Sequence, residues 1–243
     1  MGLTIRPLPR KDALELMDLP RLDGAELREA LRDLERLNRL FGGTNLILSH
    51  LGRLVKTYRL SGTISILDVG TGGADIPRAI VRWAEKRELQ VEIVACDRHE
   101  QILEAASTLC SGFTQISLVK EDALKLPYPP EHFDFSISSL TLHHLSAEEA
   151  VAVLQKLNEL SRVGFIVNDL YRSRLAYIGV FVGTRLFSRN RLIRHDGPLS
   201  VLRAFTFQEL RGMAQQAGLP DVKLYRHPFF RVAVIREKVK REE

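Results

Sequence analysis

The sequence predicts an α/β fold: a doubly wound, seven-stranded, mostly parallel sheet with an antiparallel C-terminal hairpin and an N-terminal helical cap. Three observations carry this prediction. Short apolar runs alternate with helical patterns from about residue 61 onward, which is typical of βαβ units. The last two apolar runs are too close together for a crossover helix. The first sixty residues show helical spacing instead. We expect a cap over residues 1–60 and a main domain over 61–243, with a lid-like insertion at 171–203.

The helical cap is indicated by leucines at three- and four-residue spacing. Leu27, Leu31, Leu34, Leu37 and Phe41 follow this pattern, and Gly42-Gly43 ends it. A second apolar stretch covers residues 46–55. Strands are expected at 64–69, 91–96, 115–119, 133–138, 163–167, 222–225 and 230–235. Helices are expected at 76–87, 99–110, 146–161 and 206–218, and the last two open with the capping boxes of Ser146 and Thr206.

Composition narrows the class of protein. Hydrophobic residues make up 45% of the 243 residues, which is enough to bury a core and excludes a disordered chain. The two cysteines can form neither a disulfide framework nor a zinc site, so we expect no metal and a reducing cytoplasm. No apolar run reaches the roughly 18 residues that a membrane span needs.

A glycine-rich turn follows the first predicted strand, where a doubly wound sheet binds ligands. Residues 68–74 read Asp-Val-Gly-Thr-Gly-Gly-Ala, and the glycines let a ligand approach the backbone. Asp75 stands where a dinucleotide-binding motif has its third glycine, and no Gly-Lys-Ser/Thr follows, so neither a nicotinamide site nor a P-loop is favoured. Asp97 ends the second strand and Asp122 follows the third. Ribose and adenine binding are one interpretation, while a helix N-cap and a turn residue are the other.

These motifs in this order resemble the class I S-adenosylmethionine-dependent methyltransferases over roughly residues 61–170. Within that class the similarity is to small-molecule and natural-product O-methyltransferases of the type 11/12 group. The resemblance implies a Rossmann-like methyltransferase fold and S-adenosyl-L-methionine as cofactor. It places the methionine part on Asp68, Gly70, Thr71, Gly72 and Gly73, the ribose on Asp97, and the adenine on Asp122 and Ala123. Arg98 and Ser139 complete the predicted cofactor site. Ala74 replaces a glycine that is common in the family, a change of little consequence in size.

Two histidines after the fourth strand indicate the acceptor chemistry. Leu142-His143-His144 resembles O-methyltransferases in which the first histidine and an aspartate after the fifth strand flank the acceptor hydroxyl; the matching aspartate is Asp169. A hydroxyl attacks a methyl donor as it loses its proton, and a histidine suits that removal. We therefore expect His143, His144 and Asp169 to be catalytic and the acceptor to be a small, aromatic or glycosylated product of secondary metabolism. The alternatives are that the histidines only close the strand, that Asp169 caps a helix, or that proximity alone drives transfer.

The segment 171–203 concentrates positive charge, with seven arginines and one acid, Asp196. It contains the most apolar run of the chain, residues 175–184. Three interpretations stay open: a lid over an apolar acceptor, a contact with a membrane or lipid-like substrate through 175–187, or a core helix with solvated arginines. Rival functions are methylation of RNA or another macromolecule, C-methylation of a quinone- or lipid-like acceptor, and cofactor binding without catalysis. We do not expect nucleic acid as a partner, because the segment lacks lysine and exposed aromatic clusters. A monomer and a homodimer are both open.

Overall fold

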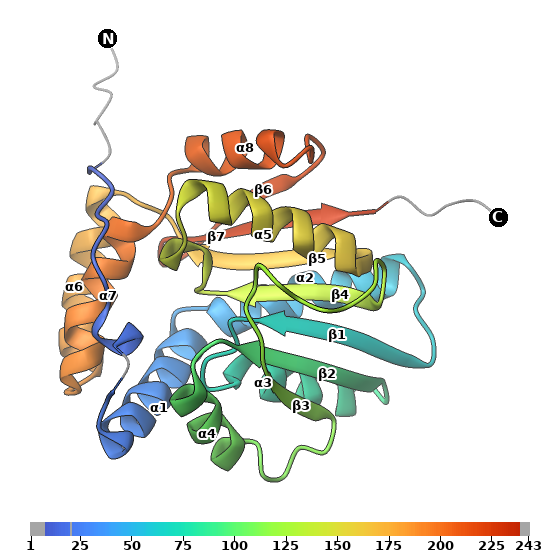
Figure 1. Ribbon diagram of the computed structural model, residues 1–243, viewed down its shortest axis with the longest axis horizontal. Coiled ribbons are helices and arrows are strands. Elements are labelled where there is room, and N and C mark those ends of the chain that lie inside the picture. The colour runs from blue at the N-terminus through green and yellow to red at the C-terminus, as the bar shows by residue number, and fades with distance from the viewer. Residues whose placement is uncertain (1–7, 20, 239–243) are drawn as a thin grey trace.

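The computed structural model describes residues 8–19 and 21–238, and it confirms the predicted fold class. The seven strands form one sheet in the order β3-β2-β1-β4-β5-β7-β6 (Figure 1). The strands are β1 (Thr63–Val69), β2 (Gln90–Asp97), β3 (Ile116–Lys120), β4 (Phe133–Ser139), β5 (Ser161–Leu170), β6 (Lys223–His227) and β7 (Arg231–Glu237).

Strand direction follows from chain connectivity. Strands β1 to β5 all run parallel: helices connect β1 to β2, β2 to β3 and β4 to β5, and an irregular loop connects β3 to β4. Strand β7 pairs antiparallel with both β5 and β6. The predicted C-terminal hairpin is therefore confirmed, and its second strand lies inside the sheet between β5 and β6. Six strands thus run in one direction and β7 runs against them.

Helices lie on both faces of the sheet and beyond one of its ends. They are α1 (Gly24–Leu40), α2 (Gly43–Thr57), α3 (Asp75–Glu85), α4 (Glu100–Leu109), α5 (Ala147–Leu160), α6 (Arg174–Phe187), α7 (Arg191–Arg203) and α8 (Phe207–Gln216), with short 3-10 turns η1 (Leu16–Asp18) and η2 (Leu142–His144). Helices α2 and α3 pack on one face, and α5 and α8 pack on the other. Both predicted capping boxes are present, at Ser146 and Thr206.

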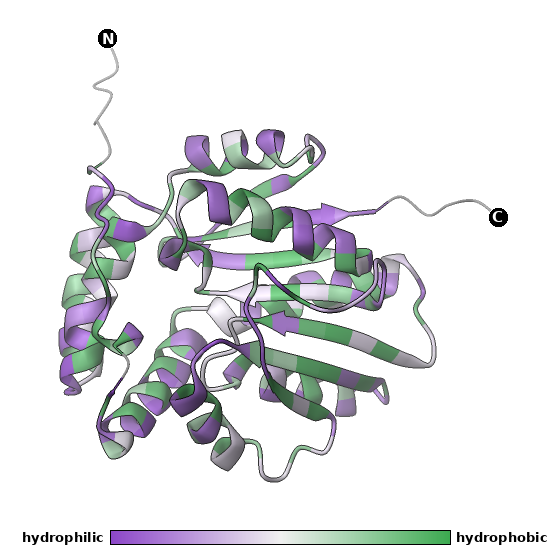
Figure 2. Cartoon of the chain, in the orientation of Figure 1, coloured by the Kyte–Doolittle hydropathy of each residue, from purple (hydrophilic) through white to green (hydrophobic). Residues whose placement is uncertain are grey.

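The two hydrophobic cores lie between the sheet and these helices. The strands read as continuous apolar runs because both of their faces are covered, and Figure 2 shows this in the hydrophobic colouring of β1 and β2. Among the residues that the structure describes, no helix combines the length and the apolar character needed to cross a membrane.

The N-terminal segment and three helices surround the carboxyl ends of the parallel strands. Figure 1 shows α1, α6 and α7 beyond these ends. Residues 8–19 run beside α7: the Lys11 amide donates to the Leu202 carbonyl, and the amides of Leu16 and Met17 donate to the Asp196 carboxylate at 2.8 and 2.9 Å. Residues 1–7 of the predicted cap lie outside the described residues.

Candidate active site

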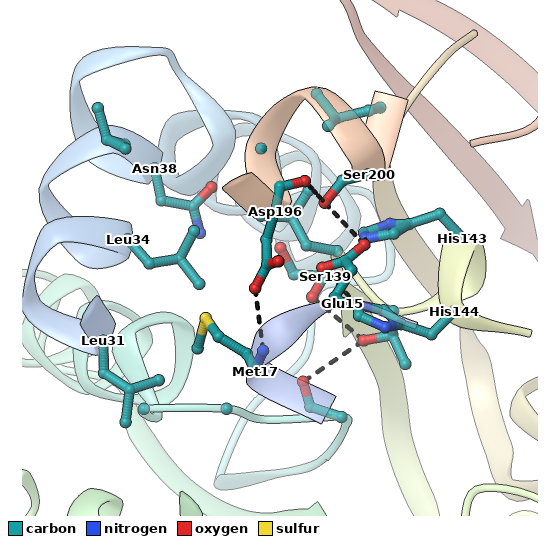
Figure 3. Close-up of a pocket in the computed structure, with 18 of the residues that line it drawn as sticks. Glu15, Met17, Leu31, Leu34, Asn38, Ser139, His143, His144, Asp196 and Ser200 are labelled. Carbon is teal, nitrogen blue, oxygen red and sulfur yellow. Dashed lines mark hydrogen bonds and ion pairs between the residues drawn. The ribbon is translucent and has the colours of Figure 1, made fainter. Parts of the chain in front are cut away.

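A cavity of about 300 Å³ opens at the carboxyl ends of the central strands. All of the residues predicted to bind cofactor or acceptor line this cavity, except Asp68 and Asp169, which lie behind its wall. Figure 3 shows Leu31 and Leu34 of α1 across the cavity from His143 and His144. The fold therefore brings the glycine turn, the two acids and the histidines to one place.

The glycine turn after β1 needs glycine for two physical reasons. Gly70 and Gly72 have φ values of +71° and +54°, in the left-handed region that disfavours other residues. A Cβ atom on Gly70 would also run into the Thr141 side chain, whereas the space beside Gly72 is open. Ala74 adopts the same region with φ +54°, so this position favours glycine through its backbone rather than its size.

Asp97 and Asp122 both stabilise local backbone and both face the cavity. The Asp97 carboxylate accepts from the amides of Gly72 and His99, each at 3.0 Å. Asp122 accepts from the Leu124 amide at 2.9 Å, as a turn residue does. A carboxylate offers about four acceptor positions, so each has capacity left for a ligand hydroxyl or amino group. The structural and the ligand-binding interpretations are thus compatible.

Asp68 lies at the end of β1, beneath the glycine turn. It is only 2% exposed, and burial raises its pKa to about 7. In this position it supports the turn from behind. The open backbone at Gly72, the neighbouring carboxylates and the cavity together suit a cationic ligand that carries hydroxyl groups, as S-adenosylmethionine does.

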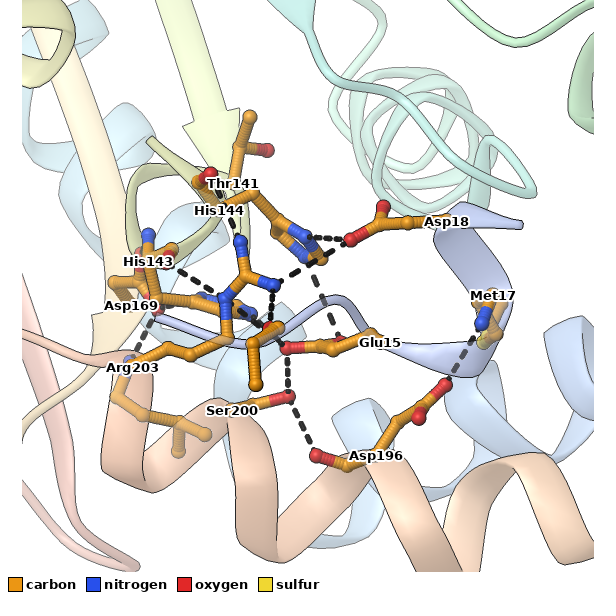
Figure 4. Close-up of polar contacts among 12 residues, drawn as sticks. Glu15, Met17, Asp18, Thr141, His143, His144, Asp169, Asp196, Ser200 and Arg203 are labelled. Atoms are coloured by element: carbon orange, nitrogen blue, oxygen red, sulfur yellow. Dashed lines mark hydrogen bonds and ion pairs between the residues drawn. The ribbon is translucent and has the colours of Figure 1, made fainter. Parts of the chain in front are cut away.

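His143 and Asp169 form a buried pair. His143 Nδ1 and one Asp169 oxygen are 2.7 Å apart, and the His143 amide donates to the other oxygen at 3.1 Å (Figure 4). Burial alone would raise the pKa of Asp169, but the His143 charge and these hydrogen bonds hold it below its ordinary value. An ionised carboxylate only accepts, so the proton of this hydrogen bond is on Nδ1, and Nε2 is the ring nitrogen left for other contacts.

Two acids of the N-terminal segment complete the cluster, and sequence reasoning missed both. Asp18 lies 3.0 Å from His144 Nδ1, and the Glu15 carboxylate lies 3.6 Å from His143 Nε2 and 3.8 Å from His144 Nε2. Asp18 and His144 are 126 residues apart in the chain. The segment around Glu15 has neither a periodic pattern nor a motif, so no sequence signal could place it here. The ligand atoms of Glu15, His143 and His144 lie within 4.8 Å of one another, a grouping that could also hold a metal ion.

Two arginines hold the histidine turn in place. Arg203 of α7 donates to the carbonyls of His143 and His144 at 3.2 and 2.9 Å, and Arg10 donates to the Leu145 carbonyl at 2.6 Å. Arg203 is 6% exposed. Part of the positive charge in the segment 171–203 is therefore committed to the fold rather than free for a partner.

The two acids of the N-terminal segment titrate in opposite directions. Burial raises the pKa of Glu15 to about 7, whereas Asp18, despite its partial burial, has its pKa lowered to about 2 by its hydrogen bond to His144 and the nearby positive charge. Glu15 is thus the acid of this cluster that titrates near neutral pH.

Replacing Glu15 by glutamine should flatten the pH dependence of stability. The folded-state pKa of about 7 exceeds the ordinary value of 4.5, so the folded chain binds the proton more tightly. The unfolded chain ionises first, and the free energy of unfolding falls as pH rises from about 4.5 through 7. Relative to Glu15→Gln, wild type should lose about 3 kcal/mol between pH 4 and pH 8. Urea titrations of both proteins at several pH values measure this loss. Asp68 contributes equally to both proteins, so its pH dependence cancels in the comparison. Parallel profiles of the two proteins would contradict the prediction.

Comparison with known proteins places this site in context. Residues 66–164 match a family model described as a methyltransferase domain. No curated protein matches the sequence. A SAM-dependent methyltransferase from Aquifex aeolicus has a similar structure, with 19% identity, 88% of this chain and 98% of that chain covered, and a TM-score of 0.56. The match to human N-acetylserotonin methyltransferase in complex with SAM covers 90% of this chain and 57% of that chain, with 18% identity and a TM-score of 0.61. The match to a putative O-methyltransferase from Nostoc punctiforme covers 83% of this chain and 60% of that chain, with 14% identity and a TM-score of 0.53.

Proposed function

We propose that this chain is a class I S-adenosylmethionine-dependent methyltransferase that transfers a methyl group to a hydroxyl of a small, aromatic or glycosylated acceptor. The observation that carries the proposal is the His143–Asp169 pair: Asp169 binds Nδ1 of a histidine that lines the cavity, which leaves Nε2 for the acceptor. S-adenosylmethionine supplies the methyl group as an electrophilic sulfonium. The protein positions the acceptor and supplies a base.

The cofactor is proposed to lie along the glycine turn. In this arrangement Gly70, Thr71, Gly72 and Gly73 contact the methionine part, with Asp68 supporting the turn from behind. Asp97 and Arg98 are assigned to the ribose, Asp122 and Ala123 to the adenine, and Ser139 to the end of the site nearest the histidines. Negative carboxylates close to a sulfonium and an ammonium group favour binding.

His143 is proposed to take the proton of the acceptor hydroxyl at Nε2. Asp169 holds the imidazole in the required tautomer and stabilises the cation that forms. The Glu15 carboxylate, 3.6 Å from Nε2, stabilises the same cation when it is ionised. His144, oriented by Asp18, is assigned to the acceptor side of the site. In this proposal, transfer and proton removal take place in a cavity that the N-terminal segment and α7 help to line.

The acceptor is proposed to be largely apolar. Carbon side chains from five parts of the fold line the cavity, among them Met17, Leu31, Leu34, Ile102, Leu140 and Phe230. Such a wall suits an aromatic ring, and it suits the quinone- or lipid-like acceptor of a C-methyltransferase equally. The proposal includes the expected division of the chain: residues 1–60 form a cap, residues 61–243 form the methyltransferase domain, and residues 171–203 act as a lid.

A methyl-transfer screen tests the proposal directly. Purified protein would receive labelled S-adenosylmethionine with phenols, sugars, carboxylic acids, quinones and RNA as acceptors. The proposal expects label on a phenol or sugar oxygen, identified by the methyl resonance of the product. Label only on carbon or on RNA would establish one of the rival functions instead.

Substitution of Asp97 should weaken cofactor binding without unfolding the protein. Asp97→Ala removes a carboxylate whose charge-assisted hydrogen bond to a hydroxyl contributes about 1.5–3 kcal/mol, which corresponds to a loss of about tenfold or more in affinity. Titration calorimetry with S-adenosylmethionine measures the change. Asp221→Ala, an exposed acid paired with Arg236, is the control and should bind normally. Unchanged affinity of Asp97→Ala would remove Asp97 from the cofactor site.

A further inference from the structure

The outer face of α6 exposes an apolar stripe to solvent. Leu175, Ile178, Val182 and Leu186 recur at three- and four-residue spacing, and they are 72%, 57%, 45% and 72% exposed. The opposite face of the helix, with Gly179, Val180, Gly183 and Thr184, lines the cavity. A helix that is apolar on both faces and covered on only one leaves an unpartnered surface.

The stripe continues onto neighbouring aromatic rings. Phe181 and Phe187 of α6 are 38% and 43% exposed. The Phe41 ring contacts Phe187 and also Phe229, with ring centroids 5.5 and 5.3 Å apart, and Phe229 at the tip of the β6–β7 hairpin is 52% exposed. We call this surface the α6 patch: Leu175, Ile178, Phe181, Val182, Leu186, Phe187 and Phe229. Figure 2 shows hydrophobic residues along α6, which lies beyond the carboxyl ends of the parallel strands.

Positive charge borders the α6 patch, and the chain from residue 170 to 195 contains no acidic residue. Arg174, Arg185 and Arg189 are exposed at the two ends of the helix, and the Arg185 guanidinium lies 3.5 Å from the centre of the Phe181 ring. The other arginines nearby are committed elsewhere: Arg172 binds Glu209, Arg191 pairs with Glu26, and Arg194 donates to backbone carbonyls.

We propose that the α6 patch docks on the surface of an anionic lipid bilayer. A helix with an exposed apolar stripe and basic ends lies in the plane of the membrane interface, where its leucines and phenylalanines enter the acyl boundary and its arginines meet lipid phosphates. The charge argues against a second copy on this face, because a twofold interface would bring the arginines of two α6 helices together and α6 itself carries no acid. The strongly apolar stripe argues against nucleic acid, whose backbone requires positive charge rather than leucines.

Docking here would set a lipid-soluble acceptor beside its binding site. Only the thickness of α6 separates the α6 patch from the cavity, since opposite faces of this one helix form the two surfaces. The docking proposal concerns the outer face alone, so it does not depend on which atom of the acceptor is methylated.

The test is sedimentation of the full chain with phosphatidylcholine vesicles that contain or lack phosphatidylglycerol. We expect binding to the anionic vesicles and at least tenfold weaker binding to the neutral ones. The double variant Ile178→Ser/Leu186→Ser should lose tenfold or more in affinity, because two large apolar side chains no longer enter the lipid. Each of Arg174→Gln, Arg185→Gln and Arg189→Gln should lose about fivefold.

Matched controls lie away from the α6 patch. Arg59→Gln, at the amino end of β1, and Tyr225→Ser, an exposed aromatic residue on β6, should bind vesicles as wild type does. Unchanged affinity of every variant for S-adenosylmethionine shows that the site is intact, which separates failure of docking from failure of the proposed function. Equal binding to both vesicle types, or no binding, would overturn the proposal. Concentration-dependent dimerisation that Ile178→Ser/Leu186→Ser abolishes would assign the surface to a second copy.

Discussion

Replacing His143 by alanine should lower kcat by roughly 10²–10⁴ at neutral pH and leave the affinity for S-adenosylmethionine nearly unchanged. General-base catalysis acts on the transition state, so the loss appears in kcat rather than in cofactor binding. Two contacts support this role for His143: its Nδ1 is 2.7 Å from Asp169, and the residue lines the cavity. Single-turnover kinetics with the acceptor found in the screen measures the effect.

Raising the pH should partly rescue this variant if the acceptor is a phenol. An ordinary phenol loses its proton near pH 10, so the phenolate forms without a base as the pH approaches that value. His132→Ala, in the exposed loop before β4, serves as the matched control and should keep wild-type kinetics. Full activity of His143→Ala at pH 7 would show that the base is another group or that proximity alone is sufficient.

The fold could be predicted because its signals are local. Each strand of the parallel sheet is a short apolar run that ends at a turn, and each connecting helix has a regular apolar spacing or a capping box, as at Ser146 and Thr206. The antiparallel hairpin followed from the short separation of its strands. The insertion of β7 between β5 and β6 had no such signal, because strand order depends on packing across the whole sheet.

The candidate site likewise contains residues that could be predicted from the sequence and residues that could not. Asp97 ends a strand, and the glycine turn, Asp122 and His143 each follow one. The carboxyl ends of parallel strands meet at one edge, so the convergence of these residues on one cavity could be expected. Glu15 and Asp18 lie in a segment with no regular pattern, and only tertiary packing places them against the histidines. Ala74 shows a further limit: size suggested a neutral replacement, whereas its positive φ depends on backbone geometry that composition does not reveal.

The segment 171–203 stayed ambiguous in the sequence because an apolar run with arginines at its ends fits several environments. In the structure, some residues of this segment are buried, some line the cavity and others are exposed to solvent. Arg172 and Arg203 are buried and hydrogen-bonded, Val180 and Thr184 line the cavity, and the stripe that includes Ile178 faces solvent. Residues two positions apart on one helix, such as Ile178 and Val180, thus serve different surfaces, and because both are apolar the sequence pattern alone cannot assign them.

Replacing Asp169 by asparagine should lower kcat by about 10- to 150-fold with little change in the affinity for S-adenosylmethionine. Asparagine keeps the shape but removes the charge, and the lost charge-assisted hydrogen bond to Nδ1 corresponds to about 1.5–3 kcal/mol in the transition state, where the imidazole becomes a cation. Asp169 does not line the cavity, so it acts as a positioning residue through His143.

The pH profile separates this role from a purely structural one. Asp169→Asn removes the negative charge that its coupling to His143 holds on Asp169, so the acidic limb of the kcat profile should move to lower pH, an effect that loss of stability alone would not produce. The double variant His143→Ala/Asp169→Asn should be no slower than His143→Ala, because Asp169 acts only through His143 and both substitutions therefore remove the same function. Asp134→Asn, a buried acid at the opposite end of the sheet, is the matched control and should leave the profile in place. If the two effects multiply in the double variant, Asp169 acts independently of His143 and the proposed pair is wrong.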